Sequence, residues 1–560
     1  MSYAEPDFHG TTRFEIRRHL GTGGMGAVYQ AYDRDRKEDV ALKTVLRADP
    51  TAVYLFKREF RNLADVAHPN LVNLYELLYE EGHWFFTMEL LDGVDFLTYV
   101  RSGAAHSGRR RPEERTGAAT TGIDLTGPSD PLQTVATPAV ASDQLDRLRF
   151  SIRQIAEGLA TLHDRGYIHR DLKPSNVMVT RVERVVILDF GLSGELTPED
   201  DNGFEPFIGT PTYMAPEQGH RSSGAPASDW YAVGVMLFEA LTGRPPFVGS
   251  YADVLIRKSQ TDAPRASQIV EAVPADLDDL CAALLRRDPL TRPSVQEVFH
   301  LLRVQAHAPI TPVAHRSART STLIGREKEL RALARAYKLS SAGRPVTVSV
   351  HGTSGIGKTA LVSAFLQELQ HDTPNVLVLS GRCYERESVP YKAIDGIVDR
   401  LTHYLMSLPA WQAATLLPPS VRALTVLFPV LLRASALTTT PDVAVDGVDP
   451  LGLRRTAFCA LRELLARIGR RQSLVITIDD LQWTDADSLA LLDDLLRPPW
   501  APSVLVILTF RSEEIPARPF LQQLLATQAD EDRAIDVGPI ADVEARDLAR
   551  RLLDPATPDR

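Results

Sequence analysis

The chain opens with short runs of aromatic and β-branched residues that are separated by turn residues. Over residues 12–100 these runs are FEIRRHL, AVYQAYD, DVALKTV, LVNLYEL and WFFTMEL, and one helical stretch lies at 51–67. Such runs, bounded by turn residues, are typical of strands. The pattern therefore predicts a small antiparallel sheet that carries one helix.

Residues 143–302 follow a mainly helical pattern, which short strand and loop pieces interrupt near 169–191. The longest apolar stretch, Trp230 to Leu241, contains the charged residue Glu239 and is only about a dozen residues long, whereas a bilayer span needs about 20. It predicts a buried helix rather than a membrane span. The N-terminus, MSYAEPDFHG, is polar and has no apolar signal core.

Two segments show neither the strand pattern nor the helical pattern. Residues 101–142 hold an Arg-Arg-Arg run followed by Gly, Ala, Thr, Ser and Pro, and such a segment cannot bury enough apolar surface to offset its ordering entropy. We expect a flexible insertion there. Residues 304–320 contain Pro309 and Pro312 and predict a linker.

After the linker, apolar runs alternate with helical patterns. The runs are VTVSV, NVLVLS, SLVITIDD and SVLVILTF. Continuous apolar strands that alternate with helices indicate a parallel sheet covered on both faces. No internal repeat is present.

Composition narrows the class of protein. The chain has 560 residues, 44% of them hydrophobic, and at about 150 residues per domain this predicts three or four units. A net charge of −10 argues against nucleic acid as the main partner, because binding a phosphate backbone needs a basic face. The three cysteines, Cys281, Cys383 and Cys459, lie far apart and suggest neither a disulfide framework nor a metal site, so a cytoplasmic location is expected.

A glycine-rich segment joins the first two predicted strands. It comprises Leu20, Gly21, Thr22, Gly23, Gly24, Met25, Gly26, Ala27 and Val28. Glycines let backbone N–H groups approach phosphate oxygens closely. The same spacing occurs in the dinucleotide-binding fingerprint, and Glu38 or Asp39 even lies near its acidic position, but that fingerprint opens a helix. Here a strand follows, and the next strand carries Lys43, which favours pairing with nucleotide phosphates.

Three further motifs follow in order: H-R-D-L-K-P-S-N at 169–176, D-F-G at 189–191 and A-P-E at 215–217. With Lys43 and the glycine-rich segment, residues 12–303 resemble a protein kinase of the Ser/Thr type. The resemblance implies a bilobal fold with an α+β N-lobe and a mainly α C-lobe. It also implies transfer of the γ-phosphate of ATP to Ser/Thr hydroxyls of proteins.

Phosphoryl transfer depends on positioning and on neutralising phosphate charge. Asp171 is the candidate that orients the substrate hydroxyl and accepts its proton, and by the resemblance Lys173 reaches the transferred phosphate. Asn176 and Asp189 offer hard oxygen ligands of the kind that Mg²⁺ prefers.

The resemblance assigns further residues to ATP. Lys43 is expected to pair with the ATP phosphates and to be held by Glu59, on the single helix of the small sheet. Met88 takes the gatekeeper position, and Glu89 begins the hinge that binds adenine.

Other residues are expected to support this site or to regulate it. Glu217 and Arg292 resemble a buried ion pair of the helical lobe, and Asp229 resembles the aspartate that braces the catalytic loop. Kinases with an arginine before the catalytic aspartate are often activated by a loop phosphate, for which Ser193 and Thr197 are candidates. The acidic residues at 195–205 are an alternative partner for that arginine.

A second phosphate-binding motif, G-x-x-x-x-G-K-T, lies at 352–359 between the run VTVSV and an apolar-periodic helix. Its residues Gly352, Gly355 and Gly357 suit a loop whose backbone N–H groups cradle phosphates. We expect Lys358 to reach the β- and γ-phosphates and the Thr359 hydroxyl to ligate Mg²⁺.

The apolar run at 474–478 ends in two acids. Asp479 is expected to bind the Mg²⁺ shell and Asp480 to polarise the attacking water; a helix N-cap is the structural alternative. Arg511 ends the next predicted strand and is a candidate sensor of the γ-phosphate.

Residues 321–540 resemble the P-loop ATPase core of AAA/STAND-type signalling NTPases. The segments LIGREKEL at 323–330 and GRCYE at 381–385 carry this resemblance, and the second recurs in modules fused to bacterial Ser/Thr kinases. It implies ATP at a second site and self-association through this module. Residues 541–560 are expected to begin a helical lid that is cut short, as in the N-terminal portion of a longer protein.

The sequence thus predicts a tail at 1–11, a bilobal kinase domain at 12–303 and, after the linker, an α/β P-loop domain with a parallel sheet. The preferred function is a protein Ser/Thr kinase in signal transduction, coupled to an ATP-binding switch. A pseudokinase scaffold that gates the ATPase is the alternative, although no kinase signature residue is missing. In a third interpretation the ATPase is primary and the kinase is its output.

Overall fold

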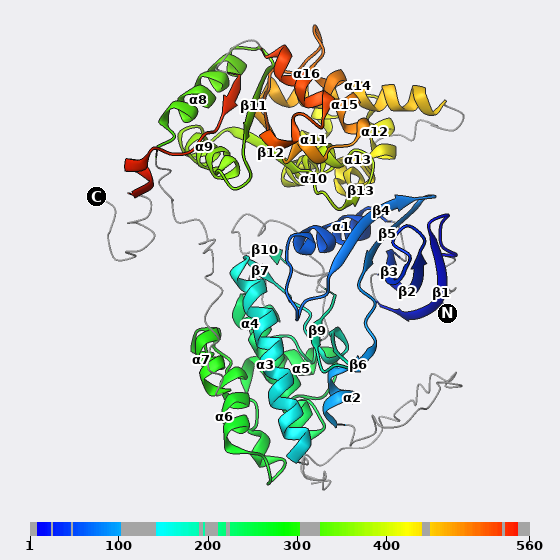
Figure 1. The fold of residues 1–560 in the computed structure, drawn as a ribbon, viewed down its shortest axis with the longest axis vertical. Helices are drawn as coiled ribbons and strands as arrows, with labels where there is room; N and C mark the ends of the chain where they lie inside the picture. Colours follow the sequence, from blue (N-terminus) through cyan, green and yellow to red (C-terminus); the bar gives the residue numbers. More distant parts are fainter. Residues whose placement is uncertain are drawn as a thin grey trace. The chain divides into compact units, whose positions relative to one another are not determined.

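The computed structural model describes residues 8–23, 26–45, 49–101, 142–189, 194–195, 211–219, 225–302, 325–438, 449–528 and 533–546. They group into two compact units (Figure 1): 1–64, 75–88 and 318–560 form the first unit, and 65–74 and 89–317 form the second. We call the first unit up to residue 88 the small lobe, residues 325–546 the P-loop module and the second unit the helical lobe. The expected linker and all but the end residues of the expected insertion lie outside the described residues.

A sheet with one helix makes up the small lobe, as the sequence predicts. Its strands are β1 (Phe14–Thr22), β2 (Gly26–Asp33), β3 (Glu38–Val45), β4 (Leu74–Glu80) and β5 (His83–Met88), and its helix is α1 (Pro50–Ala64). The pairs β1–β2, β2–β3 and β3–β5 are antiparallel. Helix α1 packs Phe56 and Phe60 against Phe86 of β5, with ring centroids 4.8 and 5.8 Å apart.

The same sheet has a sixth strand that the sequence does not predict. This strand, β13 (Glu387–Ser388), belongs to the P-loop module and pairs in parallel with β4. Figure 1 shows β13 beside β4 and α1. The small lobe and the P-loop module are therefore joined by backbone hydrogen bonding as well as by the chain.

The helical lobe is mainly α-helical with short strands, as predicted. Its helices are α2 (Phe96–Arg101), α3 (Ser142–Asp164), α4 (Pro226–Thr242), α5 (Tyr251–Gln260), α6 (Ala275–Leu284) and α7 (Val295–Leu301). Its strands are β6 (Gly93–Asp95), β7 (Tyr167–Ile168), β8 (Val177–Thr180), β9 (Val185–Ile187) and β10 (Gly194–Glu195). Short 3₁₀ helices are η1 (Pro174–Asn176), η3 (Pro216–Gly219), η4 (Ala266–Gln268) and η5 (Pro289–Thr291).

Helix α4 confirms the prediction of a buried helix in the longest apolar stretch. Its side chains are buried along nearly the whole of its length. The one charge in the stretch, Glu239, accepts a hydrogen bond from the hydroxyl of Tyr213 at 2.6 Å. No helix among the described residues is long and apolar enough to cross a lipid bilayer.

The P-loop module is built on a parallel sheet of strand order β12-β14-β15-β11-β16. The strands are β11 (Val346–Gly352), β12 (Val376–Arg382), β14 (Ser473–Asp479), β15 (Leu505–Arg511) and β16 (Ala534–Asp536). The α-helices are α8 (Glu327–Ser341), α9 (Lys358–Asp372), α10 (Lys392–Ser407), α11 (Ala410–Leu416), α12 (Val421–Leu427), α13 (Ser435–Thr438), α14 (Pro450–Gly469), α15 (Ala486–Leu496) and α16 (Pro519–Thr527). Short 3₁₀ helices are η6 (Pro429–Arg433), η7 (Leu481–Trp483) and η8 (Ser512–Glu514).

Successive residues of β14 enter different hydrophobic clusters. Leu474 and Ile476 pack with residues of α10, α14 and α15, whereas Val475 packs with residues of α8 and α9. Both faces of the sheet are therefore covered, as the continuous apolar runs predict. Because the strands are parallel, Gly352, Asp479 and Arg511 lie at one edge, where β11, β14 and β15 end.

Candidate active sites

In the small lobe, a lysine and a glutamate form a buried ion pair. Lys43 extends from β3, and its Nζ lies 2.7 Å from Oε1 of Glu59 on α1. Both side chains are less than a tenth exposed. Strand β3 and helix α1 thereby place a fixed ammonium group on the face of the sheet that α1 covers.

The glycine-rich segment forms a strand–turn–strand, and this geometry excludes the helix-opening dinucleotide fingerprint. Leu20 to Thr22 end β1, and Gly26 to Val28 begin β2. The turn is closed by a hydrogen bond of 2.8 Å from the N–H of Gly23 to the carbonyl of Gly26. A Cβ on Gly26 would lie 2.2 Å from the carbonyl oxygen of Thr44, so the close approach of β3 requires glycine there. Gly24 and Met25 lie outside the described residues.

In the helical lobe, the structure brings Asp171, Lys173 and Asn176 together. Lys173 Nζ lies 2.7 Å from Oδ2 of Asp171. The Asn176 side-chain amide donates to the backbone carbonyl of Asp171 at 2.9 Å and to its Oδ2 at 3.3 Å. One carboxylate thus lies between an ammonium and an amide.

Asp229, in the first turn of α4, holds this loop in place. Its two oxygens accept the backbone N–H groups of His169 and Arg170, each at 2.9 Å, and Oδ2 also meets His163 Nε2 at 2.8 Å. Burial opposes ionisation of Asp229, but these hydrogen bonds and the nearby histidines outweigh it and lower its pKa. The expected bracing aspartate is therefore present.

The residue before the expected Mg²⁺ ligand Asp189 is hydrogen-bonded through its backbone to Asn176. Leu188 donates its N–H to the Asn176 carbonyl at 2.8 Å, and Asp189 adopts a φ of +54°.

At the expected adenine-binding positions, Met88 ends β5 in the small lobe. In the helical lobe, the carboxylate of Glu89 meets the Arg184 guanidinium at 2.7 and 2.8 Å. Ser193, Thr197 and most of the acidic run lie outside the described residues.

Two further contacts organise the helical lobe. Arg292 binds Glu217 in a bidentate pair, at 2.6 and 2.8 Å, as expected. Lys258 on α5 was not singled out from the sequence: its Nζ donates to the carbonyls of Pro211, Thr212 and Met214 at 2.9, 2.6 and 2.7 Å. Burial lowers the pKa of Lys258 to about 7.

In the P-loop module, the phosphate-binding motif forms a loop between β11 and α9. Gly355 and Gly357 adopt φ angles of +76° and +100°, in the region that favours glycine. Lys358 Nζ donates to the carbonyls of Gly352 and Thr353 at 3.0 and 2.9 Å. Burial lowers the pKa of Lys358, while the negative charge of Asp480 opposes that shift.

The acidic end of β14 faces this loop. The Thr359 hydroxyl lies 3.1 and 3.3 Å from the two oxygens of Asp479, and the Thr509 hydroxyl of β15 also bonds to Asp479. The structure thus joins the two residues that the sequence assigns to Mg²⁺ at this site.

Asp480 has partners that the sequence did not identify. Arg382, at the end of β12, binds its Oδ2 at 3.1 and 3.2 Å, and Gln482 donates to Oδ1 at 2.9 Å. Arg511 Nε lies 3.9 Å from Oδ1. Asp480 precedes η7, yet its side chain makes no capping hydrogen bond there, which argues against the N-cap alternative.

Glu513, in η8, also contacts the phosphate-binding loop. Its carboxylate accepts the backbone N–H of Ser354 at 3.0 Å, and backbone hydrogen bonds, its own and that of Ser354, lower its pKa. An anionic oxygen can therefore bind this loop N–H, which is the property a phosphate cradle needs.

Comparison with known proteins assigns two parts of the chain to domain families. The family model described as protein kinase domain matches residues 14–301, and the one described as AAA ATPase domain matches residues 322–507. Serine/threonine-protein kinase PrkC of Bacillus subtilis is 27% identical over 285 residues, 50% of this chain and 38% of PrkC. PknL of Mycobacterium tuberculosis is 28% identical over 322 residues, 55% of this chain and 71% of PknL.

PknE of Mycobacterium tuberculosis is 29% identical over 282 residues, which are 50% of this chain and 43% of PknE. The chain thus spans less than half of the length of PrkC and PknE. The kinase-domain match covers more than half of the chain itself, and the two phosphate-binding motifs lie within the two matched ranges. The chain therefore belongs to the protein kinase family, and an AAA ATPase domain follows its kinase domain.

Proposed function

We propose that the chain is an ATP-dependent protein Ser/Thr kinase whose P-loop module binds a second ATP as a signalling switch. The observation that carries the proposal is the cluster of Asp171 with Lys173 and Asn176, together with the ion pair of Lys43 with Glu59. Phosphoryl transfer to an alcohol needs a carboxylate for the hydroxyl and cations for the phosphates. The chain presents both.

Each group takes one role in this proposal. Asp171 orients the Ser/Thr hydroxyl and accepts its proton, while Lys173 neutralises the phosphate being transferred. Lys43 binds the ATP phosphates and Glu59 fixes its position. Adenine contacts the segment that begins at Met88 and Glu89, and the glycine-rich segment covers the phosphates.

Mg²⁺ is part of the proposal at both sites. No cluster of three or more His, Cys, Asp or Glu side chains that could hold a metal ion occurs among the described residues. Mg²⁺ bound to nucleotide needs only one or two protein ligands besides phosphate and water, so Asn176 and Asp189 fit the kinase site. Thr359 and Asp479 fit the P-loop site, and the ion would neutralise phosphate charge there.

At the P-loop site, Lys358 binds the β- and γ-phosphates, and the loop glycines Gly352, Gly355 and Gly357 expose N–H groups to them. Asp480 polarises water, and Arg511 senses the γ-phosphate. Arg382 is added to the expected set, because its guanidinium orients Asp480.

The pseudokinase alternative is not favoured, because the signature residues are present. Within the small lobe Lys43 is paired with Glu59, and within the helical lobe Asp171 is paired with Lys173. We also propose the domain division given by the sequence, a cytoplasmic location and self-association through the P-loop module.

The test is incorporation of label from γ-labelled ATP into the purified chain and into myelin basic protein, with phosphosite mapping. Wild type is expected to label Ser and Thr. Lys358→Ala is expected to bind ATP at the P-loop site at least about tenfold more weakly while label transfer persists, because Lys358 serves only the second site. Lys338→Ala, an exposed lysine on α8, is the control. Loss of all label transfer in Lys358→Ala would instead favour the ATPase as the primary activity.

Lys258 gives a second prediction. Lys258→Met leaves three carbonyls of the 211–214 segment without their donor. This segment directly precedes the A-P-E motif, and we infer that it helps to position the protein substrate. We expect kcat/KM for myelin basic protein to fall about 10- to 100-fold, since a misplacement of about 1 Å has effects of that size. The KM for ATP should stay near wild type, as should all constants of Arg257→Met, a change at an exposed arginine on the same helix.

The same lysine predicts a pH dependence. A neutral amine has two N–H donors for three carbonyls, so one carbonyl loses its donor as the pH rises through about 7. Wild-type turnover of the protein substrate should therefore fall between about pH 7 and 9. Turnover by Lys258→Met should not show this fall, because methionine has no proton to lose. Equal profiles for the two proteins would contradict this role.

A further inference from the structure

Helix α1, which carries Glu59, has a second face that the kinase site does not use. Residues two apart on a helix point about 200° apart, so Lys57 and Arg61 lie on the side away from Glu59. Phe56 and Phe60 pack on the small lobe's own sheet, while Lys57 and Arg61 meet the P-loop module. The helix is thus held from both sides within the first unit.

Three acidic side chains of the P-loop module form ion pairs with these two cations. Lys57 Nζ lies 2.6 and 2.7 Å from the two oxygens of Asp395 on α10. Arg61 lies 2.6 Å from Glu387 of β13, 2.8 Å from Asp395 and 3.5 Å from Asp399. Lys57 and Asp395 are 4% and 7% exposed, so these charges are removed from solvent.

Two apolar and backbone contacts extend the same interface. Tyr54, one turn before Lys57, packs against the hydrophobic cluster of the P-loop module, and the Arg433 guanidinium lies 4.3 Å from its ring centroid. At the end of α1, Arg386 Nη1 donates to the Ala64 carbonyl at 3.4 Å. Contacts therefore run from the first turns of α1 to its last residue.

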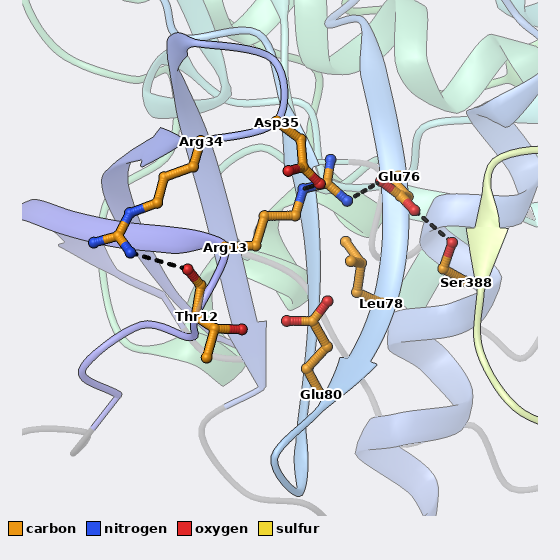
Figure 2. A pocket seen from close by; sticks show the side chains of 8 residues that line it. All are labelled: Thr12, Arg13, Arg34, Asp35, Glu76, Leu78, Glu80 and Ser388. Carbon is orange, nitrogen blue, oxygen red and sulfur yellow. Dashed lines mark hydrogen bonds and ion pairs between the residues drawn. The ribbon is translucent and has the colours of Figure 1, made fainter.

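Strand β13 fixes the register of the interface. Leu77 of β4 donates its N–H to the Arg386 carbonyl at 2.9 Å, and the Ser388 hydroxyl bonds to Glu76. Figure 2 shows Ser388 and Glu76 facing each other, with Arg13 on the other side of Glu76. All three line a pocket of about 560 Å³. The P-loop module thus completes a chain of polar contacts that crosses the edge of the small lobe.

Hydrogen bonds within the P-loop module also hold these acidic residues. Asp485 accepts the backbone N–H groups of Tyr391 and Lys392 at 3.0 and 3.1 Å, which anchors the start of α10. The side chain of Lys392 donates to the Glu387 carbonyl at 2.8 Å and so ties β13 to α10. We name Glu387, Asp395 and Asp399 the docking surface.

The charge state of the docking surface matches its partners. Burial opposes ionisation of Asp395, but Lys57 and Arg61 outweigh it and lower its pKa to about 2. Asp399 has a pKa raised to about 6 by burial and by the charge of Asp395, against the pull of Lys57 and Arg61. Removing the Asp395 charge would leave the buried ammonium of Lys57 without its carboxylate, whereas Arg61 would keep Glu387 and Asp399. An unpaired buried charge is strongly destabilising, so this change favours a position of the helix in which Lys57 reaches water.

We propose that the docking surface of the P-loop module positions the kinase site: by binding Lys57 and Arg61, it holds α1 where Glu59 pairs with Lys43. Asp395 is then a positioning residue for phosphate transfer, although it lies in the other domain. This inference rests on the proposed kinase function, because the pairing of Lys43 with Glu59 matters only for ATP bound in the kinase domain.

The test compares Asp395→Asn, Lys57→Met and the double variant in the full chain. Measured are kcat and KM for ATP with myelin basic protein, hydrogen exchange of peptides from α1, and ATP binding at the P-loop site. Asp395→Asn is expected to lower kcat about tenfold and to speed exchange of α1 about tenfold. The double variant should be no slower than Asp395→Asn, because the stranded ammonium is gone. ATP binding at the P-loop site should not change.

Asp493→Asn is the matched control, since it removes an exposed acid from α15 of the same module, and it should leave all three measurements near wild type. Wild-type kcat and wild-type α1 exchange in Asp395→Asn would overturn the proposal. So would loss of ATP binding at the P-loop site in parallel with kcat, which would make Asp395 a residue needed for folding of its own module. A wild-type chain without phosphate transfer would overturn the proposed function, and exchange of α1 would then still decide whether the docking surface holds the helix.

Discussion

Replacing Asp171 with asparagine is expected to lower phosphate transfer by about 100- to 10,000-fold, the range lost when a general base is removed. Asparagine has the same shape, so the amide of Asn176 can still bond to the backbone carbonyl of residue 171, and the loop keeps its support from Asp229. What disappears is the negative charge that Lys173 faces at 2.7 Å and the capacity to accept a proton. The measurement is label transfer from ATP to the chain itself and to myelin basic protein.

The matched control is Asp146→Asn, an exposed aspartate on α3 of the same lobe, for which we expect wild-type rates. ATP binding at the P-loop site should be unaffected in Asp171→Asn, because the variant residue lies in the other unit. Transfer that stays within a few fold of wild type would show that the kinase assignment of this loop is wrong.

The sequence predicted part of the local chemistry of both sites. The pairing of Lys43 with Glu59 was expected from the resemblance to protein kinases, and Thr359 and Asp479 were both expected at Mg²⁺ from the P-loop motif and the acids that end a later apolar run. The structure has both contacts. The parallel sheet followed from apolar runs, because a strand buried on both faces leaves no polar positions.

The docking surface could not be predicted in the same way. Lys57 and Asp395 are 338 positions apart, and no periodicity tells which of many acids a given lysine will meet. One signal was present: Lys57 and Arg61 are four apart, as are Asp395 and Asp399, so the two helices carry matching charges one turn apart. Strand β13 has only two residues, too few for a pattern of alternation to be seen.

The partners of Asp480 show an intermediate case. Arg382 lies in the motif GRCYE, which marked the family resemblance but gave no role to the arginine. Its role depends on β12 lying next to β14 in the sheet, where Arg382 is in register with Asp479. Strand order is a tertiary property, and a single sequence does not determine it.

Replacing Arg292 with methionine is expected to destabilise the helical lobe by about 3–5 kcal/mol, the cost of leaving one partner of a buried ion pair without the other. Arg292 is 7% exposed, and besides Glu217 it donates to the backbone carbonyls of Ala227, Arg286 and Arg287 at 2.8, 2.8 and 2.9 Å. These bonds tie the segment after α6 to the start of α4, the helix that presents Asp229 to the catalytic loop. Phosphate transfer should therefore fall as well, but through loss of the folded lobe.

Hydrogen exchange of the helical lobe as a function of urea separates this effect from a catalytic one, since a chain of two units need not unfold in one step. Arg292→Met should open the lobe at lower urea, whereas Asp171→Asn should not. The double variant with Glu217→Gln should recover part of the loss, because no unpaired carboxylate remains. Arg181→Met, which removes an exposed arginine of the same lobe, should cost at most about 1 kcal/mol.

The pH dependence of unfolding gives an independent check on the same pair. Burial opposes ionisation of Glu217, but Arg292 outweighs it and lowers the pKa of Glu217 below its ordinary value of 4.5. A carboxylate with a lowered pKa stabilises the folded state above its ordinary pKa, and that contribution is lost as the pH falls through the folded-state value. The free energy of unfolding of wild type should therefore fall as the pH drops below about 4.5. The fall should be smaller in Arg292→Met, because the variant lacks the guanidinium that lowers the pKa of Glu217. Equal acid sensitivity of the two proteins would show that Glu217 owes its ionisation to something other than Arg292.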